Sequence, residues 1–448
     1  MPKKKTALTI EERLQQALVP AEEQPYEVPE NWVWVRLIGN VNSCLDGYRK
    51  PINSSERAKR VGKVPYYGAT GQVGWIDDYL TNEHLVLLGE DGAPFLDLLK
   101  DKAYIIFGEA WVNNHAHILK SYFGEIGNVF LMHYLNMVDY KDYVKGTTRL
   151  KLTQGSMQLM PFPLPPFSEQ QRIVERIEEL FAKLDEAKER LQEVADSFAV
   201  RKAAILHKAF TGELTKQWRL ENGVSDESWE DKLLGDVCTV NPKKIDAKNL
   251  DDNLEVSFVP MAAVSDVLGE IVNHEVKNLQ DVRTGFTNFS KGDVIFAKIT
   301  PCMENGKSAI VGPLVNDIGY GSTEFYVLRC KEELNNKYLY HMVRNTTFRA
   351  EAKAVMTGVV GQQRVPKTFL QEYQLLLPTL SEQHEIVRLI DDLLARERAA
   401  QQAAEQALAS IDLMKKSILA RAFRGELGTN KASEASALEL LKQVLAEN

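Results

Sequence analysis

The stretch SEQQRIVERIEELFAKL at residues 168–184 occurs a second time, with changes, as SEQHEIVRLIDDLLARE at residues 381–397. The offset between the two copies is 381 − 168 = 213 residues. A second pair, ILHKAFTGEL from Ile205 and ILARAFRGEL from Ile418, has the same offset, 418 − 205 = 213. Equal offsets mean that one unit containing both blocks is duplicated without insertion. Because dissimilar stretches precede and separate the copies, the order is variable, repeat, variable, repeat.

Each copy has the spacing of a long helix that packs against another helix. Pro165 and Pro166 precede the first copy, and Ser168 with Gln171 is expected to form a capping box. Apolar positions then recur at alternating steps of four and three, as in a coiled coil of roughly 40 Å. In the first copy these positions are Ile173, Ile177, Leu180, Leu184, Ala187, Leu191, Val194 and Phe198. The equivalent positions of the second copy are Ile386, Ile390, Leu393, Glu397, Ala400, Ala404, Ala407 and Ile411.

The two apolar seams differ in size, since the first is bulky and the second is lined by alanine in its middle. Large residues facing small ones let two helices approach closely at normal packing density. The sequence therefore predicts that the two copies pack on each other. The alternative is that each seam packs only on its own domain.

Composition excludes several classes of protein. The 448 residues carry a net charge of −8, with 44% hydrophobic and 26% charged residues, which is ordinary for globular domains. No apolar run reaches the length of a membrane span, and the start, MPKKKTALTIEERLQQ, lacks the apolar core of a secretory signal. Cys44, Cys238, Cys302 and Cys330 are far apart in the chain, so free thiols in a reducing cytoplasm are expected.

The variable stretches have the pattern of mixed α/β domains with curved sheets. Residues 32–41 (WVWVRLIGNV) and 229–240 (WEDKLLGDVCTV) both open with Trp, and short apolar runs such as LVLLG and DVIFAKI alternate with Gly, Pro and Asn turns. The termini add two short amphipathic helices, one capped by Thr9 with Glu12 and one over residues 435–446, which can pair or bind a partner. The expected fold class is α+β, with two such domains separated by two long helices in a pseudo-two-fold repeat.

Two stretches resemble known functional motifs, but each lacks a residue that its motif requires. LPPF at 164–167 has Leu164 where an amino-methyltransferase needs a residue that hydrogen-bonds the flipped base. ENGKSAI at 304–310 has Pro301 where a P-loop needs Gly. His115 and His117 alternate in WVNNHAHIL, but no nearby acid or thiol completes a metal set, so polar surface or base contact is expected instead. We expect no catalytic residue, no bound cofactor and no metal.

These residues give the chain a close resemblance to the specificity subunit of type I restriction–modification enzymes. The resemblance rests on the duplicated blocks with their AFTGEL and AFRGEL ends. It also rests on KVPYYGATG (63–71), GEDGAPF (89–95), WVNNHAHIL (111–119) and GDVIFAKITPCMENGKSAIV (292–311). It implies two target-recognition domains that each read one half of a bipartite DNA site, and an antiparallel coiled coil that sets the gap.

The resemblance also implies partners and a division of the chain. Two modification subunits would bind S-adenosylmethionine and methylate adenine. Two restriction subunits would supply translocation and cleavage driven by ATP with magnesium, all in the cytoplasm and without a membrane. The expected segments are an N-terminal helical segment (1–25), recognition domain 1 (26–165), spacer 1 (166–214), recognition domain 2 (215–378), spacer 2 (379–427) and a C-terminal helical tail (428–448).

Candidate DNA contacts are polar and basic residues in the variable stretches, because phosphate contacts position a protein on DNA and base contacts specify the sequence. In the first domain they are Arg57, Lys59, Arg60, Lys63, Tyr66, Tyr67, Asn113, Asn114, His115, Thr147, Thr148 and Arg149. In the second they are Lys243, Lys244, Lys298, Thr300, Asn305, Lys307, Gln362, Gln363 and Arg364. The strongest group is GQQR at 361–364, and TTRLK at 147–151 occupies the same relative place.

Two other functions fit the sequence. The negative net charge favours a coiled-coil scaffold that joins two globular modules and binds no DNA. A specificity module of a related methylation-based phage-defence system without restriction subunits has the same sequence features.

Overall fold

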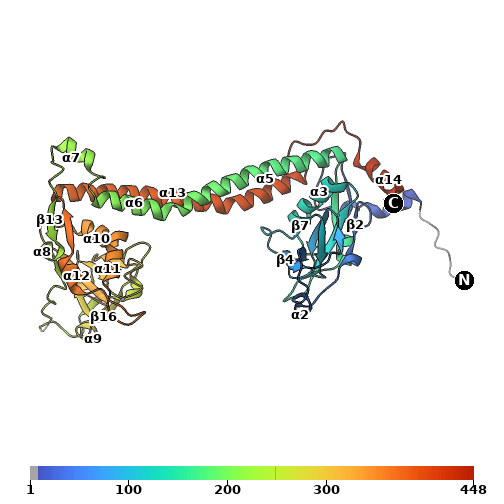
Figure 1. Ribbon diagram of the computed structural model, residues 1–448. Coiled ribbons are helices and arrows are strands. Elements are labelled where there is room, and N and C mark those ends of the chain that lie inside the picture. Colours follow the sequence, from blue (N-terminus) through green and yellow to red (C-terminus); the bar gives the residue numbers. More distant parts are fainter. Residues whose placement is uncertain (1–8, 248, 448) are drawn as a thin grey trace. The chain divides into compact units, whose positions relative to one another are not determined.

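The two repeated blocks form long helices in the computed structural model, which describes residues 9–247 and 249–447. The first copy gives α5 (Phe167–Asp196) and α6 (Phe198–Phe210), and the second gives α13 (Leu380–Ala422) (Figure 1). The predicted capping box is wrong, because α5 begins at Phe167 and Ser168 already lies in its first turn. The Gln170 backbone amide donates to the Pro166 carbonyl at 3.0 Å, so the first helical turn already includes Ser168. The Gln171 side chain donates to Glu175 instead of capping.

Along α5, the buried face shifts away from the positions predicted by a strict heptad spacing. Ile173 and Ile177 are fully buried and Leu184 and Leu191 are half-buried, but Val194 is 41% exposed and the neighbouring Ala195 takes its place. An α-helix of 3.6 residues per turn drifts by about 20° per heptad against a 3.5 repeat, so its buried face moves to the next residue.

A local break adds to this drift, because α5 ends at Asp196 and α6 begins at Phe198. At the junction, the Ser197 hydroxyl donates to the Val194 carbonyl at 2.9 Å, a bond that bends helices. On α13, Ala400 is exposed whereas Ala404 is buried. The predicted seam positions at Val194 and Ala400 are therefore wrong.

Contacts divide the chain into two units. Unit 1 contains the chain up to Gln192 and from Glu405 onwards, and unit 2 contains Glu193–Ala404. Each unit therefore holds one variable stretch, the start of its own repeat helix and the end of the helix from the other repeat. The prediction that the two copies pack on each other is confirmed in both units.

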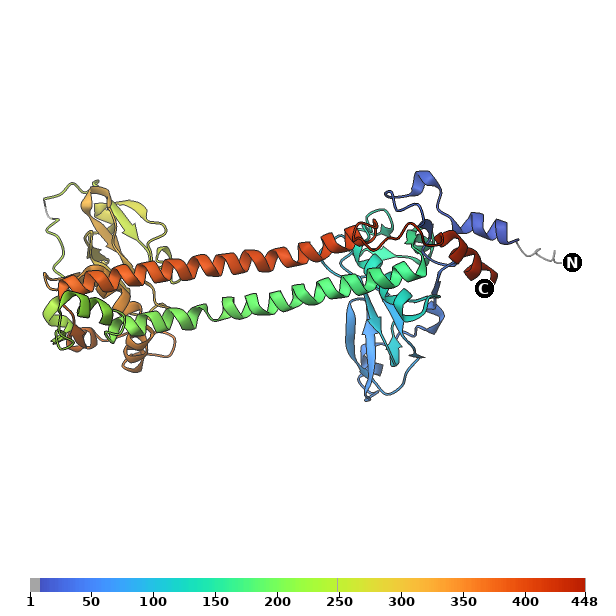
Figure 2. The ribbon, with the colours of Figure 1, turned by 90° about the horizontal axis from the view of Figure 1, so that it is seen from above.

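The helices run antiparallel where they pair. In unit 1, Lys415 and Asp185 lie 2.6 Å apart and Lys188 and Asp412 lie 3.4 Å apart, so residue numbers rise on α5 as they fall on α13. In unit 2, Arg201 and Glu397 form the corresponding ion pair at 2.7 Å. Figure 2 shows α5 and α6 alongside α13 from a second direction.

A buried glutamate anchors the start of each repeat helix to residues that follow the end of the other one. In unit 1, Glu169 accepts hydrogen bonds from Trp32 Nε1 and Asn430 Nδ2, both at 2.8 Å. In unit 2, Glu382 accepts from Thr215 Oγ1 at 2.6 Å and from Arg219 Nη1 at 2.7 Å. Both glutamates are fully buried, although the sequence suggested only helix caps here.

The variable part of unit 1 contains two four-stranded sheets and a two-stranded ribbon, together with a small hairpin. The first sheet has the order β2 (Asn42–Cys44), β9 (Ala116–Ser121), β6 (Leu85–Gly89), β7 (Ala103–Ile106). The second has the order β4 (Gly71–Ile76), β3 (Val64–Gly68), β8 (Glu109–Val112), β5 (Thr81–Asn82). The ribbon pairs β1 (Val33–Arg36) with β12 (Pro161–Leu164), and the hairpin pairs β10 (Val144–Lys145) with β11 (Lys151–Leu152).

Unit 2 repeats the two sheets and the ribbon with dissimilar residues. Its first sheet has the order β14 (Cys238–Val240), β21 (Phe325–Cys330), β18 (Val294–Ala297), β19 (Ser308–Ile310). Its second has the order β16 (Glu275–Asn278), β15 (Glu255–Val259), β20 (Gly319–Gly321), β17 (Thr287–Phe289). The ribbon pairs β13 (Glu230–Leu233) with β22 (Gln374–Leu377). The strand directions also match, since β3 with β8 and β15 with β20 are the parallel pairs.

Short helices complete each unit. Those in unit 1 are α1 (Ile10–Ala17), η1 (Ala21–Glu23), η2 (Asp46–Tyr48), α2 (Ser54–Arg57), α3 (Gly124–Met137), α4 (Gln154–Leu159) and α14 (Ala437–Glu447). Those in unit 2 are α7 (Lys216–Asn222), α8 (Leu234–Val237), η3 (Met261–Ala263), α9 (Leu279–Val282), η4 (Val315–Asp317), α10 (Asn336–Arg344), α11 (Thr346–Ala354) and α12 (Lys367–Glu372). The helices α3 and α10 are equivalent, because each packs on the first sheet of its unit.

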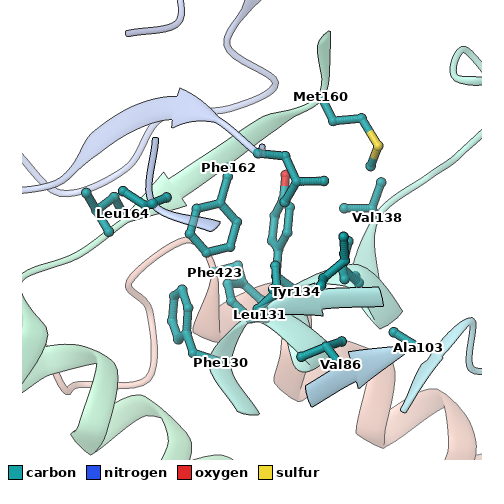
Figure 3. Packing of buried hydrophobic residues seen from close by; sticks show 14 of the residues in the cluster. Val86, Ala103, Phe130, Leu131, Tyr134, Val138, Met160, Phe162, Leu164 and Phe423 are labelled. Carbon is teal, nitrogen blue, oxygen red and sulfur yellow. The ribbon is translucent and has the colours of Figure 1, made fainter. Parts of the chain in front are cut away.

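The end of the second repeat closes the core of unit 1. Phe423, directly after α13, is fully buried, and its ring lies 5.0 Å from that of Phe130 and 5.2 Å from that of Tyr134, both on α3 (Figure 3). The equivalent residue of the first repeat, Phe210, lies 5.2 Å from Tyr338 on α10 in unit 2. The same cross-repeat contact therefore occurs twice.

The two terminal helices pair with each other. The predicted capping box of Thr9 and Glu12 is present at the start of α1. The side chains of Ala17 on α1 and of Leu441 and Leu445 on α14 share one buried cluster. The end helices thus extend the core of unit 1. In the described part of the chain, no helix is both long enough and apolar enough to cross a membrane.

The cysteines are free, but two of them are not far apart in space. Cys238 on β14 and Cys330 on β21 are direct partners across an antiparallel ladder. Burial raises the pKa of the Cys238 thiol far above its usual value, and that of Cys330 to about 12. Both thiols are therefore protonated and poorly nucleophilic.

Candidate nucleic-acid interface

Three segments converge at one end of the first sheet of unit 1, and we call this place site 1. It contains Glu90 and Asp91 after β6, His115 before β9, and the loop 146–151. Backbone hydrogen bonds join the segments, since Glu90 N donates to His115 O and Leu152 N donates to Glu90 O, both at 2.8 Å. The sheet thus places the predicted residues His115 and Arg149 beside each other.

Acidic residues hold the basic residues of site 1 in place. Asp91 Oδ1 accepts from Arg149 Nη2 at 2.8 Å and lies 2.6 Å from His115 Nδ1. Glu90 Oε1 lies 2.8 Å from Lys151 Nζ, and Glu90 also bonds Arg49. Burial alone would raise the pKa of Glu90, but hydrogen bonds from Lys151 and Arg49 hold it below its usual value. Arg149 nevertheless keeps 60% of its side chain exposed.

Site 2 is the corresponding place in unit 2. It contains residues 298–300 after β18, Glu324 before β21, and the loop 357–364. Lys298 N donates to Glu324 O at 2.9 Å, and Val365 N donates to Lys298 O at 2.9 Å, which repeats the two backbone bonds of site 1. Thr300 N donates to Gln363 O at 3.0 Å. The structure therefore brings together five predicted residues: Lys298, Thr300, Gln362, Gln363 and Arg364.

Glu324 orients the arginine of site 2. Arg364 Nε and Nη2 donate to the two carboxylate oxygens of Glu324 at 2.9 and 2.8 Å, and this bond holds the pKa of Glu324 below its usual value. Burial lowers the pKa of Lys298, whose ammonium lies 5.1 Å from the centre of the Tyr326 ring. A guanidinium held in one plane is suited to bidentate recognition of a base edge or a phosphate.

The tip of the site 2 loop is apolar and fully accessible. Val359 is 78% and Val360 is 92% exposed. The flanking Gly358 and Gly361 have φ of +124° and +83°, values that side-chain-bearing residues rarely adopt. The tip at the same place in site 1 contains Thr147 and Thr148, which are also exposed and β-branched. The valines and the acidic partners Asp91 and Glu324 carry no signal in the sequence, because only their spatial proximity to the predicted residues identifies them.

Other predicted residues of unit 1 lie near the second sheet, with Arg57 at the end of α2 and Arg60 in the loop that follows it. The Arg57 guanidinium lies 4.9 Å from the Tyr66 ring centre, and that of Arg60 lies 4.6 Å from the Trp111 ring centre. Arg60 also pairs with Asp77 at 2.6 Å. The remaining accessible candidates are Lys59, Lys63 and Asn114, which are exposed, and Tyr67, which is half-buried.

Two predictions in unit 1 are wrong. Tyr66 is only 1% exposed and belongs to a small core with Ile76 and Trp111. Asn113 is 7% exposed, and its Oδ1 accepts from His115 N at 2.8 Å, so its side chain shapes the turn before β9. Both side chains are therefore packed within the unit and are not exposed for contact with a base.

In unit 2, the remaining candidates are scattered. Lys243 and Lys244 are exposed after β14, and Asn305 is exposed in the loop before β19. Lys307 is half-buried, and its ammonium donates to the Met261 carbonyl at 3.2 Å. The structure does not bring these residues into site 2.

The sequence suggested that His117 lies at the surface, but this residue is only 1% exposed. An acid and a thiol do lie near it, since Cys44, Asp46 and His117 offer atoms within 4.8 Å of one another. Both ring nitrogens are already engaged, Nδ1 with Asp46 Oδ2 at 2.6 Å and Nε2 with Leu152 O at 2.9 Å. Arg49 Nη2 lies 2.9 Å from Asp46 Oδ2 and balances the charge of that carboxylate. This cluster is best explained as a structural ion pair beneath site 1.

Taken together, the two sites present amide, hydroxyl and cationic donors on equivalent loops. Such donors suit phosphate oxygens and base edges.

Comparison with known proteins agrees with this architecture. The family model described as "Type I restriction modification DNA specificity domain" matches residues 29–196 and 226–407. The specificity subunit of the type I restriction enzyme EcoEI from Escherichia coli is 33% identical over 263 residues, which cover 49% of this chain and 44% of that protein. The EcoDI specificity subunit from Escherichia coli is 23% identical over 458 residues, which cover 94% of this chain and 96% of that protein. The chain thus matches less than half the length of some relatives.

Among solved structures, the HsdS subunit from Thermoanaerobacter tengcongensis superposes with a TM-score of 0.59 at 18% identity, covering 90% of this chain and all of that chain. A chain from a study of complex assembly and conformational transition of the type I R-M system gives a TM-score of 0.60 at 17% identity, with the same coverage. At this identity, the similarity establishes the fold. The fold and the match of the family model to both halves lead to one conclusion: the chain belongs to the family of type I restriction-modification DNA specificity domains.

Proposed function

We propose that the chain is the DNA-recognition subunit of a type I restriction–modification complex and has no catalytic site of its own. Each unit reads one half of a bipartite target, unit 1 through site 1 and unit 2 through site 2, together with the neighbouring basic residues. The observation that carries this proposal is that two variable stretches of dissimilar sequence build corresponding sites at equivalent ends of two equivalent sheets. Units that share a scaffold and differ in the loop residues are suited to reading two different sequences.

The proposed partners follow from the family. Two modification subunits would bind S-adenosylmethionine, and two restriction subunits would use ATP and magnesium, in the cytoplasm. The paired repeat helices would dock the modification subunits and set the number of unread base pairs between the half-sites. Since both helices contribute to both units, a heptad inserted into each should lengthen the gap and leave the half-sites unchanged.

The central experiment is single-molecule methylation sequencing of DNA from a host that carries this chain with its modification subunits. We expect one bipartite motif with an unread gap. A continuous motif, or no new methylation with a folded complex, would contradict the proposal.

A matched pair of variants tests the role of site 2. Arg364→Ala removes a guanidinium bound to Glu324, and Arg388→Ala removes an exposed one bound bidentately to Glu385 on α13 at 2.8 and 2.7 Å. Arg364→Ala and Gln363→Ala should each relax one half-site, by roughly 1–3 kcal/mol per lost bidentate contact. Arg388→Ala should leave both half-sites unchanged. Equal weakening on all sequences would instead make Arg364 a phosphate contact.

The scaffold alternative is favoured by the net charge of −8 and by the carboxylates that neutralise Arg149 and Arg364. Duplex binding across a salt series, with the modification subunits present, separates the two functions. DNA binding requires an affinity that falls with salt, because phosphate contacts release counterions. An affinity that does not change with salt would favour the scaffold.

A further inference from the structure

Each unit contains a histidine on its sheet-packed helix that bonds a carboxylate on its own repeat helix. In unit 1, His133 Nε2 on α3 lies 2.7 Å from Glu178 Oε1 on α5. In unit 2, His341 Nε2 on α10 lies 3.1 Å from Asp391 Oδ1 on α13. The histidine side chains are 5% and 8% exposed, whereas the carboxylates are 58% and 44% exposed. In both units, a nearly buried histidine thus hydrogen-bonds an accessible carboxylate.

The two contacts are equivalent. The carboxylates are 391 − 178 = 213 residues apart, which is the repeat offset. The histidines are 341 − 133 = 208 residues apart, in stretches that share the short pattern aromatic-Leu-x-His, FLMH at 130–133 and YLYH at 338–341. Three residues before each histidine is the aromatic residue, Phe130 or Tyr338, that packs on the end of the other repeat. Both halves thus retain the histidine and its carboxylate partner although the rest of their variable stretches differ.

On both helices, the residue three positions after the histidine hydrogen-bonds the backbone at or just before an edge strand of the first sheet of its unit. In unit 1, Asn136 Oδ1 accepts from Ala103 N at 2.8 Å and its Nδ2 donates to Ala103 O at 2.8 Å, at the start of β7. In unit 2, Arg344 Nη1 donates to Gly306 O at 2.8 Å, just before the equivalent strand β19. One helix therefore connects the sheet that carries each site to the repeat helix.

Other charged groups lie near both contacts: Asp101, Lys102 and Lys416 line the cavity beside His133, and Lys202, Glu270 and Arg398 line the one beside His341. Lys415 on α13 lies close enough to Glu178 to favour its carboxylate, and its ammonium lies 4.9 Å from the Phe181 ring centre. Lys337 on α10 donates to Asp391 Oδ2 at 3.0 Å. In both units, the hydrogen bond from the histidine is the largest influence that holds the carboxyl pKa below its usual value.

We propose that the pairs His133–Glu178 and His341–Asp391 are positioning latches that fix the orientation of each recognition sheet on its repeat helix. They thereby determine which gap length the complex accepts. The inference rests on the proposed bipartite reading. If a base-contacting loop can rotate relative to the spacer helix, it can still reach its bases when the gap between the half-sites is one base pair longer or shorter. Loss of one latch should therefore broaden the accepted gap without changing the bases that are read.

The test uses the assembled methyltransferase complex and synthetic duplexes whose gap is natural, one base pair longer or one shorter. Glu178→Ala and Asp391→Ala remove the latch acceptors at accessible helix positions, where folding is least at risk. The adjacent Glu179→Ala and Asp392→Ala are matched controls, because these carboxylates are also exposed and bond only cations on their own helix. We expect the latch variants to lose about tenfold of the preference for the natural gap, the scale of one charged hydrogen bond, and the controls to keep it.

A second set of variants separates positioning from contact with a partner subunit. His133→Gln keeps a donor near the position of Nε2 and should retain most of the gap preference. His133→Leu should lose it, and adding Glu178→Ala to His133→Leu should cost nothing further. Folded latch variants with the wild-type gap preference, or additive effects of the two changes, would overturn the proposal. A wild-type complex that methylates no bipartite site would refute the proposed function itself, which is a separate outcome.

Discussion

Phe423→Ala tests whether the end of the second repeat belongs to the first recognition domain. Phe423 is fully buried, and the whole of unit 2 separates it in sequence from the earlier residues of the core that it completes. Figure 3 shows its ring against those of Phe130 and Tyr134. Deleting a buried phenylalanine typically costs about 3–5 kcal/mol, and the two ring contacts place this site in the upper part of that range.

The expected cost is a large share of the stability of a domain, which is typically about 5–15 kcal/mol. We expect faster hydrogen exchange in the amides of β6 and α3, by about three orders of magnitude where exchange follows opening of unit 1 (about tenfold per 1.4 kcal/mol). Exchange in β18 and α10 of unit 2 should stay unchanged. The measurement is exchange followed by mass spectrometry on the intact chain.

Phe107→Ala is the matched control, because Phe107 lies between β7 and β8 of the same unit and is 80% exposed. It should change stability by less than about 0.5 kcal/mol. If Phe423→Ala loosened only the neighbouring part of α13, or if both variants had the same effect, the cross-repeat core would not carry the stability that we assign to it.

Three further predictions concern buried and paired charges. Arg219→Met leaves the fully buried Glu382 without its cation and should cost about 3–5 kcal/mol in urea unfolding, whereas Arg388→Met, at an exposed site, should cost little. Burial raises the pKa of Glu169, so the folded chain holds this proton to higher pH than the unfolded chain and loses stability as pH rises through that pKa. Glu169→Gln should remove this dependence, seen as a flatter plot of Tm against pH. The hydrogen bond from His341 lowers the pKa of Asp391 from 3.8 to about 2, so Asp391→Asn should destabilise unit 2 at neutral pH and have progressively less effect as pH falls from about 4 to 2 in thermal unfolding.

Much of the architecture could be predicted from the sequence. The repeat offset predicted two equivalent helices, and the unequal seams predicted that the copies pack on each other. Alternating short apolar runs predicted the strands, since LVLLG became β6 and VIFA became β18. These features are local or periodic, so the spacing of residues along the chain is enough to identify them.

The composition of the sites could be predicted only in part. Gln363, Arg364, His115 and Arg149 were identified by type, and the fold placed them at equivalent ends of two sheets. Their role in reading DNA stays a prediction. Tyr66 was misassigned because aromatic and polar residues look alike whether they face the solvent or the core.

The sequence by itself determined that this protein has a duplicated helical spacer and two dissimilar domains. Only the tertiary structure decided which groups meet: Asp91 with Arg149, Glu324 with Arg364, and a histidine on each sheet-packed helix with its repeat helix. The physical reason is that helix faces follow from a short repeating pattern. These contacts depend instead on strand pairing and helix packing between residues that are 40 to 58 positions apart.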